Sequence, residues 1–447
     1  MEKHPIIMRP ELLNRLITAK NHNLVKILTG VRRCGKSFLL FTLFKNHLLE
    51  SGVKNDHIIE INLESDSFRT CRDAIALGDA IRPLLIHDGA TNYILIDEIQ
   101  HARPALAPGV DISRMRPEDR PSAYTTFYDV LNGLLRLGFA NIYVTGSNAH
   151  LLSSDVATEF RGRGEIIEVQ PLSFSEFHPL MKGRFEFDQI RDEYFRYGGL
   201  PECVLLETEE EKVSYLNNLC ESIYLRDIAD RHKLRNDILL AALTDTVMSN
   251  IGGLTNPAKL TNAINSTGKV KCNHVTIAKY LEFLKESFIV KRATRFDVKG
   301  KRYLDYPSKY YAIDTGIRNA RTEFRQVERS HLMENVIYNE LCRLGYSVDV
   351  GAVETFPSNG GTQTRKMSEV DFVLNKASER IYVQSAFAIP DSEKRKQETY
   401  SLSHIGDSFR KVVIVGDTRE SPWRNEQGII FMSLAQFLLE PKSLETL

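Results

Sequence analysis

The segment that most constrains this chain runs from Gly30 to Ser37 and reads GVRRCGKS. A short, mostly apolar strand pattern (LVKILT, residues 24–29) precedes it, and the helical pattern FLLFTLFKNHLL follows. The two glycines of the segment let the backbone turn so that its N–H groups, with the N-terminus of the next helix, converge on phosphates. The order strand, GxxxxGKS, helix therefore predicts a phosphate-binding loop (P-loop).

The side chains of this loop have separate expected roles. Lys36 is expected to reach the β and γ phosphates of ATP, and Ser37 is expected to coordinate Mg²⁺. ATP and Mg²⁺ are therefore the expected ligands. The residues expected to contact the nucleotide are Gly30, Arg33, Cys34, Gly35, Lys36, Ser37 and Phe38.

A second apolar strand pattern, YILID, begins at Tyr93 and ends in two carboxylates, Asp97 and Glu98. A strand that is apolar on both faces is typical of a buried parallel sheet. Asp97 is expected to hold the magnesium ion, usually through water, and Glu98 to polarise the water that attacks the γ phosphate. A switch that only binds nucleotide has no need of Glu98, so the pattern favours hydrolysis.

A third strand pattern (residues 141–146) ends in the polar side chains of Ser147 and Asn148. Both are suited to lying beside the γ phosphate, and Asn148 is expected to help position the water. Two arginines follow in FRGRG, Arg161 and Arg163. Either guanidinium could neutralise charge in phosphoryl transfer, in its own subunit or across to a neighbour, or could form a surface ion pair instead.

Composition is that of a globular protein with several domains. The chain has 447 residues, and 42% of them are hydrophobic. This length exceeds the size at which one hydrophobic core usually stops growing. No apolar run is long enough to cross a bilayer and no signal peptide is evident, so we expect a cytoplasmic protein without a membrane partner. The six cysteines are widely spaced, which argues against a disulfide framework and against a zinc site.

Taken in order, five segments resemble a large family of bacterial and archaeal AAA-superfamily ATPases with a C-terminal domain of uncharacterised function. The segments are GVRRCGKS, YILIDEIQ, YVTGSNAHLLSSD, FRGRGEIIEVQPLSFSEF and YFRYGGLPE. The resemblance implies an ATPase core over residues 1–180 and a helical lid over 181–235. It also implies that Arg163 is the better candidate for an arginine finger.

Residues 236–318 contain three helical patterns followed by a hairpin pattern, which is typical of a winged helix-turn-helix. The third helix begins near His274, where a DNA-reading helix faces the major groove, and the turn from Lys299 to Arg302 corresponds to the wing tip. The formal charge of the whole chain is zero, yet residues 266–310 carry eleven Lys and Arg against four acidic residues, a net charge of +7. Nucleic acid is the expected partner of this segment, although winged helices also pack against proteins.

Residues 319–447 resemble the core of restriction-endonuclease-like nucleases, in which a helix glutamate, an aspartate and a Glu-x-Lys pair bind a metal ion. Glu334 and Asp371 match that pattern, but Gln384-Ser385-Ala386 stands where Glu-x-Lys is needed. A neutral amide binds metal more weakly than a carboxylate, and the lysine is missing. We therefore expect a degenerate nuclease-like domain without cleavage activity.

The sequence thus predicts an α/β protein in which a parallel P-loop core is followed by a lid, a winged helix and a nuclease-like domain. Its expected function is ATP hydrolysis coupled to conformational change on or with nucleic acid. Two alternatives stay open: an ATP-dependent switch or remodeller that binds only protein, and an ATP-gated nuclease. A homo-oligomer with the arginine acting between subunits and a monomer with the arginine acting in the same subunit are both compatible with the sequence.

Overall fold

A computed structural model of the chain describes residues 6–147, 160, 162–234, 237–268, 270–325, 328–355, 358–359, 362–363 and 365–446. The chain forms two compact units. The first spans residues 1–170 with 286–288, and the second spans residues 171–285 and 289–447. Within the described ranges, no helix combines the length and apolar character that crossing a bilayer requires.

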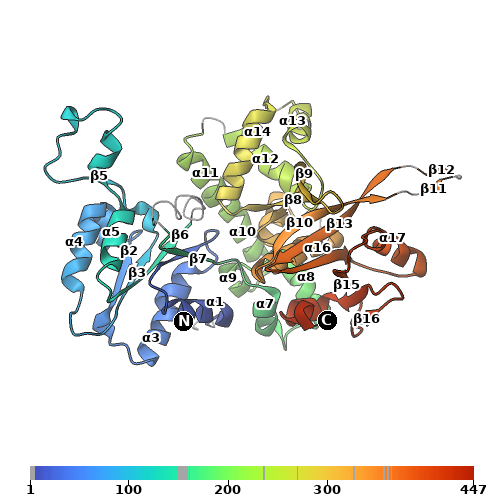
Figure 1. Ribbon diagram of the computed structural model, residues 1–447, viewed down its shortest axis with the longest axis horizontal. Coiled ribbons are helices and arrows are strands. Elements are labelled where there is room, and N and C mark those ends of the chain that lie inside the picture. The colour runs from blue at the N-terminus through green and yellow to red at the C-terminus, as the bar shows by residue number, and fades with distance from the viewer. Residues whose placement is uncertain are drawn as a thin grey trace. The chain divides into compact units, whose positions relative to one another are not determined.

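A parallel sheet of five strands forms the centre of the first unit, in the order β2-β3-β6-β1-β7 (Figure 1). Its strands are β1 (Val25–Thr29), β2 (Ile58–Asn62), β3 (Asn92–Asp97), β6 (Ala140–Gly146) and β7 (Gly164–Glu168). Every residue of β1, β3 and β6 is buried, as the continuous apolar patterns predict. The predicted parallel α/β core is confirmed.

Helices of the first unit cover this sheet and contribute to its core. They are α1 (Pro10–Ala19), α2 (Lys36–Phe38), α3 (Lys45–Glu50), α4 (Ala74–Ile81) and α5 (Phe127–Leu135); residues Leu39–Phe44 continue α2 into α3 as a π-helical segment. Leu77 and Leu131 from α4 and α5 share one buried cluster with Ile94 and Ile142 of the sheet. Each such side chain contributes about 1.5–3 kcal/mol when fully buried. A small ribbon, β4 (Ala105–Leu106) with β5 (Tyr124–Thr125), completes the unit.

The first part of the second unit is helical. Its helices are α7 (Phe174–Met181), α8 (Phe187–Tyr197), α9 (Pro201–Leu205), α10 (Glu209–Asn218), α11 (Arg226–Arg231), α12 (Asp237–Ser249), α13 (Pro257–Ser266), α14 (His274–Glu286) and α15 (Thr315–Arg321). A π-helical segment, Leu219–Leu225, joins α10 to α11. The three helices predicted between residues 237 and 287 are present as α12, α13 and α14.

A mixed sheet of eight strands follows, in the order β16-β17-β15-β14-β13-β10-β8-β9. Its strands are β8 (Val290–Asp297), β9 (Arg302–Ala312), β10 (Ser347–Thr355), β13 (Lys366–Lys376), β14 (Glu379–Ala386), β15 (Arg410–Val415), β16 (Trp423–Arg424) and β17 (Ile430–Ser433). The remaining helices are α16 (Arg329–Arg343), α17 (Ser392–Ser403), α18 (Leu434–Leu439) and α19 (Ser443–Thr446). A two-residue ribbon, β11 (Ser358–Asn359) with β12 (Thr362–Gln363), lies between β10 and β13 in the chain.

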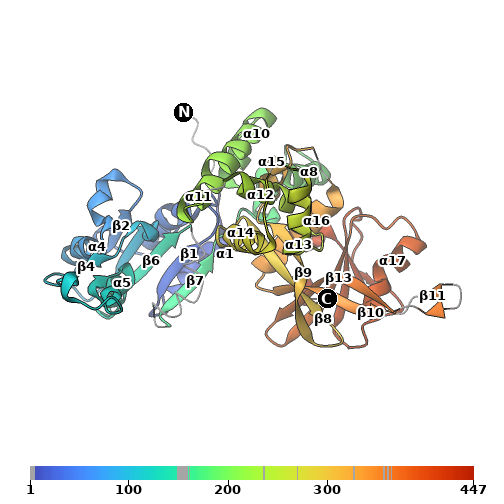
Figure 2. The same cartoon turned by 90° about the horizontal axis from the view of Figure 1, so that it is seen from above.

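The hairpin predicted as the wing, β8 with β9, belongs to this larger sheet. Val350 to Ala352 of β10 pair in parallel with β8, and Figure 2 shows the hairpin continuing the sheet beside β10. A strand edge carries N–H and C=O groups that need partners, and β10 supplies them to β8. The sheet therefore continues across residue 318, where we expected one domain to end, and residue 318 itself lies within α15.

Asp314 explains the glycine pair of the YGGLP segment. The Asp314 carboxylate accepts hydrogen bonds from the backbone N–H of Gly199 at 2.7 Å and of Ile317 at 3.1 Å, which caps α15. Gly198 has φ 75°, and a Cβ atom there would lie 2.1 Å from Asp314 Oδ1. From α15, the Asn319 amide donates to the carbonyls of Phe195 and Arg196 near the end of α8. The segments predicted as a lid and as a winged helix thus share buried hydrogen bonds.

Candidate nucleotide site

The P-loop leaves the carboxyl end of β1 and turns directly into α2. Gly30 has φ 145°, and a Cβ atom there would lie 2.0 Å from the carbonyl oxygen of Val169. Gly35 adopts the left-handed conformation (φ 93°) at the N-cap of α2. The buried Lys36 side chain folds back over this turn, and its Nζ donates to the carbonyls of Gly30 and Val31 at 3.0 Å each. The ammonium group is therefore held inside the loop.

Arg9 fixes the loop from outside the motif. Its Nη1 donates to the carbonyl of Cys34 at 3.1 Å and to that of Gln170 at 2.9 Å, and the side chain is buried. Cys34 in turn donates its Sγ–H to the Val169 carbonyl at 3.1 Å, and burial raises the pKa of this thiol. Cys34 therefore packs as an inert, protonated thiol that holds the loop to the strand beside it.

Ser37 and Asp97 meet at the end of the sheet. The Ser37 hydroxyl donates to Asp97 Oδ1 at 2.9 Å, and the Thr145 hydroxyl donates to the same oxygen from the neighbouring strand β6. Burial raises the pKa of Asp97; the two hydroxyl donors lower it, and the charge of Glu98 raises it further. Asp97 is thus a buried carboxylate whose ionised form is stabilised by local donors.

Glu98 is held in an unusual backbone conformation beside Asp97. Its φ of 54° lies in the left-handed region, and its N–H donates to Thr145 Oγ1 at 2.9 Å. The Glu98 carboxylate accepts from the Ser147 hydroxyl at 3.2 Å and from the Gln100 amide. Strained conformations of this kind cost about 1–3 kcal/mol and concentrate at functional sites. The carboxylate is therefore oriented by two neighbours.

The chemistry of these side chains fits magnesium. Ser37, Asp97 and Thr145 present oxygen atoms only, and Mg²⁺ prefers oxygen ligands while keeping several waters. Ser37 and Asp97 would hold the ion, as the sequence predicts. The loop, its lysine, the buried carboxylate and the second, oriented carboxylate thus lie together in one unit.

A family model described as an AAA domain matches residues 22–178. An uncharacterized protein of Haemophilus influenzae is 33% identical over 439 residues, which cover 97% of this chain and 99% of that protein. The chain belongs to the AAA superfamily. Uncharacterized protein MJ1544 of Methanocaldococcus jannaschii is 27% identical over 403 residues, covering 88% of this chain and 81% of that protein. A second model, described as a domain of unknown function, matches residues 188–328.

Similarity to solved structures adds little. The Orc1 protein of Aeropyrum pernix, solved in complex with DNA, shares 13% sequence identity, covering 73% of this chain and 95% of that one. The TM-score of this comparison is 0.26.

Arg163 lies at the opposite end of the AAA sheet from the P-loop. Its carbonyl accepts from Val25 N–H at 2.8 Å, at the start of β1, whereas the P-loop begins after the end of β1. At about 3.3 Å per residue, the length of β1 separates the two by about 16 Å. The exposed Arg163 side chain is therefore not brought to the nucleotide site of its own chain. Asn148 and Arg161 lie outside the described residues.

Other predicted contacts are at the loop but differ in exposure. Arg33 has φ 65° at the turn of the P-loop, and Phe38 is 41% exposed at the start of the helix. Sequence reasoning missed Arg9, Thr145 and Gln100. Arg9 lies outside the motifs, and nothing in the sequence indicates that it reaches the loop. Gln100 ends the YILIDEIQ segment, but its sequence position does not reveal that its amide contacts Glu98. Thr145 was within reach, because it ends a strand that neighbours the one carrying Asp97.

Glu334 and Asp371, the residues that match a nuclease pattern in the sequence, lie with Glu369 around a lysine. Lys309 Nζ lies 2.9 Å from Glu334, 2.7 Å from Glu369 and 3.7 Å from Asp371, and its side chain is only 3% exposed. Burial lowers the pKa of Lys309, but the charges of the three carboxylates outweigh the effect of burial, so the pKa is raised. Burial and the charge of Glu334 raise the pKa of Asp371. Gln384 Oε1 accepts from the Asp371 N–H at 3.4 Å. Within the described part of the chain, no group of three or more His, Cys, Asp or Glu side chains is arranged to hold a metal ion.

Proposed function

We propose that this AAA protein hydrolyses ATP to ADP and phosphate, and couples hydrolysis to a conformational change while acting on or with nucleic acid. The observation that carries the proposal is the pairing of Asp97 with Ser37 beside an oriented Glu98. Asp97 and Ser37 suit a magnesium nucleotide, and Glu98 suits the attacking water. Both carboxylates belong to one strand end, so a single turn supplies metal binding and water activation.

In the proposed reaction, water attacks the γ phosphorus in line, the bond to the β–γ bridging oxygen breaks, and ADP leaves with the electron pair. Glu98 accepts a hydrogen bond from the water, orients it, and takes up its proton as the new P–O bond forms. Lys36 leaves its loop carbonyls to contact the β and γ phosphates. Mg²⁺, when bound, neutralises charge on the phosphate oxygens. The loop N–H groups do so from the other side.

Arg163 is proposed to act between subunits. It is exposed, and the length of β1 separates it from the P-loop of its own chain. A guanidinium that stabilises the transition state must lie within hydrogen-bonding distance of the phosphates. A neighbouring copy of the chain could supply that contact, which favours a homo-oligomer with the arginine acting in trans.

Nucleic acid is the proposed partner of the second unit. At the start of α14, His274 and Lys279 are exposed, and Val275 is 66% exposed. Lys299, Lys301 and Arg302 are exposed at the β8–β9 turn. Lys309 belongs to the same +7 segment but is buried among carboxylates, so it adds nothing to this surface. Phosphate binding by the remaining cations is expected to weaken steeply with salt.

The test is steady-state ATP hydrolysis by the purified protein, with and without single- and double-stranded DNA and RNA. Lys36→Ala serves as the blank. Stimulation by one nucleic acid supports the proposal and identifies the ligand class. If stimulation persists when Lys299, Lys301 and Arg302 are replaced by glutamine, the hairpin is not required, and α14 becomes the proposed binding surface. Turnover that no nucleic acid changes would contradict the nucleic-acid part and leave the ATPase part standing.

Two other functions remain as alternatives. Zero formal charge over the chain favours an ATP-dependent switch that binds only protein, because no overall field attracts nucleic acid. An ATP-gated nuclease is less favoured, because Lys309 neutralises the carboxylates that would bind its metal. A salt-dependent gel shift separates nucleic-acid binding from the protein switch.

A further inference from the structure

A cavity of about 220 Å³ lies at the carboxyl ends of the parallel strands β15 and β17 in the second unit. Val415 ends β15 and Ser433 ends β17, and both line the cavity. In open α/β sheets, ligands bind preferentially outside the carboxyl ends of parallel strands. The P-loop, Asp97 and Glu98 belong to the other unit, and none of them lines this cavity.

One wall of the cavity is a flat aromatic surface. The rings of Trp423 and Phe431 stack with their centroids 4.3 Å apart and an interplanar angle of 3°. The Arg395 guanidinium lies over the Trp423 ring, 5.1 Å from its centroid. Arg395 is exposed and Trp423 is partly exposed, so the guanidinium can move off the ring by a change of side-chain rotamer while the backbone stays in place. A planar group of similar width can take its place on the ring.

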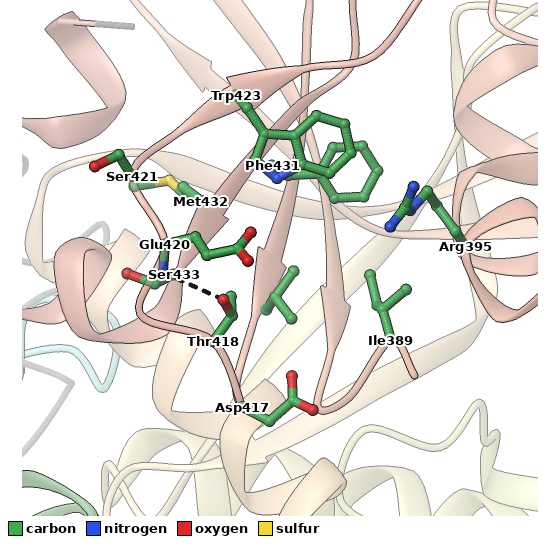
Figure 3. Close-up of a pocket in the computed structure, with 11 residues that line it drawn as sticks. Ile389, Arg395, Asp417, Thr418, Glu420, Ser421, Trp423, Phe431, Met432 and Ser433 are labelled. Atoms are coloured by element: carbon green, nitrogen blue, oxygen red, sulfur yellow. Dashed lines mark hydrogen bonds between the residues drawn. The ribbon is translucent and has the colours of Figure 1, made fainter. Parts of the chain in front are cut away.

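The remaining walls carry groups of opposite charge. Figure 3 shows the Glu420 carboxylate and the Arg395 guanidinium on opposite sides of the cavity, both directed inward, with Asp417 below them. The Glu420 backbone is fixed by a hydrogen bond from its N–H to Thr418 Oγ1 at 3.2 Å. Within the described residues, neither Asp417 nor Glu420 forms an ion pair. The cavity therefore offers an aromatic ring for stacking. The N–H donors of the Arg395 guanidinium lie on one side, and the two oxygens of the Glu420 carboxylate lie on the other.

We propose that this cavity binds a single unpaired guanine base, stacked on Trp423 between Arg395 and Glu420. Guanine presents two acceptors, O6 and N7, on one edge, and guanidinium groups bind this pair in a bidentate manner. Its other edge presents N–H donors at N1 and N2, which suit the two oxygens of a carboxylate. Adenine and the pyrimidines lack this combination of two acceptors and two donors on separate edges. Stacking adds about 1–3 kcal/mol and is insensitive to which base is bound.

The base could come from a free guanine nucleotide or from an unpaired position of a nucleic acid. The second source rests on the proposed function, whereas the first does not. Both share one recognition chemistry, so the experiment includes an arm for each source.

Trp423 is the only tryptophan of the chain, so its fluorescence reports on this cavity directly. We expect saturable quenching by GMP, with at least tenfold weaker quenching by AMP, CMP and UMP. The same titration in Lys36→Ala removes binding at the P-loop and is expected to be unchanged. A single-stranded oligonucleotide with one guanine among adenines, compared with an all-adenine strand, tests the polymer source.

Two substitutions test the recognition edges. Glu420→Gln and Arg395→Met are each expected to weaken GMP binding tenfold or more. Matched changes at exposed positions that do not line the cavity, Glu426→Gln and Arg424→Met, are expected to leave it unchanged. The proposal would be overturned if GMP and AMP quenched equally, or if GMP gave no saturable quenching. These outcomes leave the ATPase test unaffected, because that test measures turnover at the P-loop.

Discussion

Ser37 and Asp97 stand 60 residues apart in the chain, yet the serine hydroxyl donates to the aspartate carboxylate across 2.9 Å. The contact exists because β1 and β3 end at the same edge of the sheet, with β6 between them. Thr145 of β6 donates to the same carboxylate oxygen and also receives the Glu98 N–H. One hydroxyl of the intervening strand therefore contacts both the Asp97 carboxylate and the Glu98 backbone.

Glu98→Gln is expected to keep ATP binding and to lower turnover by about 10²- to 10⁴-fold, the range typical of a removed general base. The amide keeps the shape of the side chain and can still contact Ser147, so folding should be retained. Steady-state hydrolysis and nucleotide binding measure the two effects. Glu50→Gln, at an exposed position of α3, is the control. Turnover at the wild-type rate in Glu98→Gln would reject its role.

A mixing experiment tests Arg163. Lys36→Ala is expected to lose nucleotide binding, and Arg163→Ala is expected to lose turnover, so each variant alone should be inactive. If the arginine acts between subunits, mixing the two should restore part of the activity, because some interfaces join an intact P-loop to an intact arginine. Inactive mixtures that still co-assemble, or an active Arg163→Ala alone, would contradict the proposed role.

Arg9→Met is expected to destabilise the first unit by about 1–3 kcal/mol, the usual cost of leaving buried polar groups without partners. Methionine retains much of the apolar length but cannot donate to the carbonyls of Cys34 and Gln170. Nucleotide affinity should fall as well, because the loop loses its anchor. Denaturant unfolding and ATP titration measure these effects, and Arg15→Met at an exposed position of α1 is the comparison. Unchanged values in both assays would show that Arg9 is dispensable.

Asp314 makes the stability of the second unit depend on pH. Burial raises its pKa to about 6, against hydrogen bonds that lower it. The unfolded carboxyl ionises near pH 4. Its stabilising effect is therefore complete below about pH 4 and is lost as the pH rises through about 6, a change of roughly 3 kcal/mol.

Urea unfolding followed by Trp423 fluorescence measures this pH dependence. Asp314→Asn carries no titrating proton, so its free energy of unfolding should change less with pH in this window than that of the wild type. The comparison is the slope between pH 4 and 6, whatever the absolute stability of the variant. Identical slopes would assign the effect to other groups.

The carboxylates around Lys309 give a last prediction. With Lys309 bound to Glu334 and Glu369, we expect no cleavage of DNA or RNA in Mg²⁺ or Mn²⁺. Incubation with labelled substrates and each metal checks this. Metal-dependent cleavage that disappears in Asp371→Ala would show that the site is active.

The sequence predicted much of the first unit, because β1, β3 and β6 are mostly apolar and buried throughout, and the P-loop and the two carboxylates follow strand ends. The proximity of Asp97 and Ser37 could be predicted, because the carboxyl ends of parallel strands lie at the same edge of a sheet. Arg9 could not be assigned, because its contacts depend on where α1 begins. Lys309 was counted as part of a basic surface, since sequence spacing does not reveal that β9 turns it toward α16.

The hairpin described as a wing is the end of an eight-stranded sheet, bonded along β8 to β10. In many winged helices the wing is a short flap that can bend independently. Here a bend would require breaking backbone hydrogen bonds to β10, so the hairpin has little freedom to adapt its shape. A ligand that displaced Lys299 or Lys301 would therefore have to move β8 together with β10, and the displacement would be transmitted to the rest of the sheet.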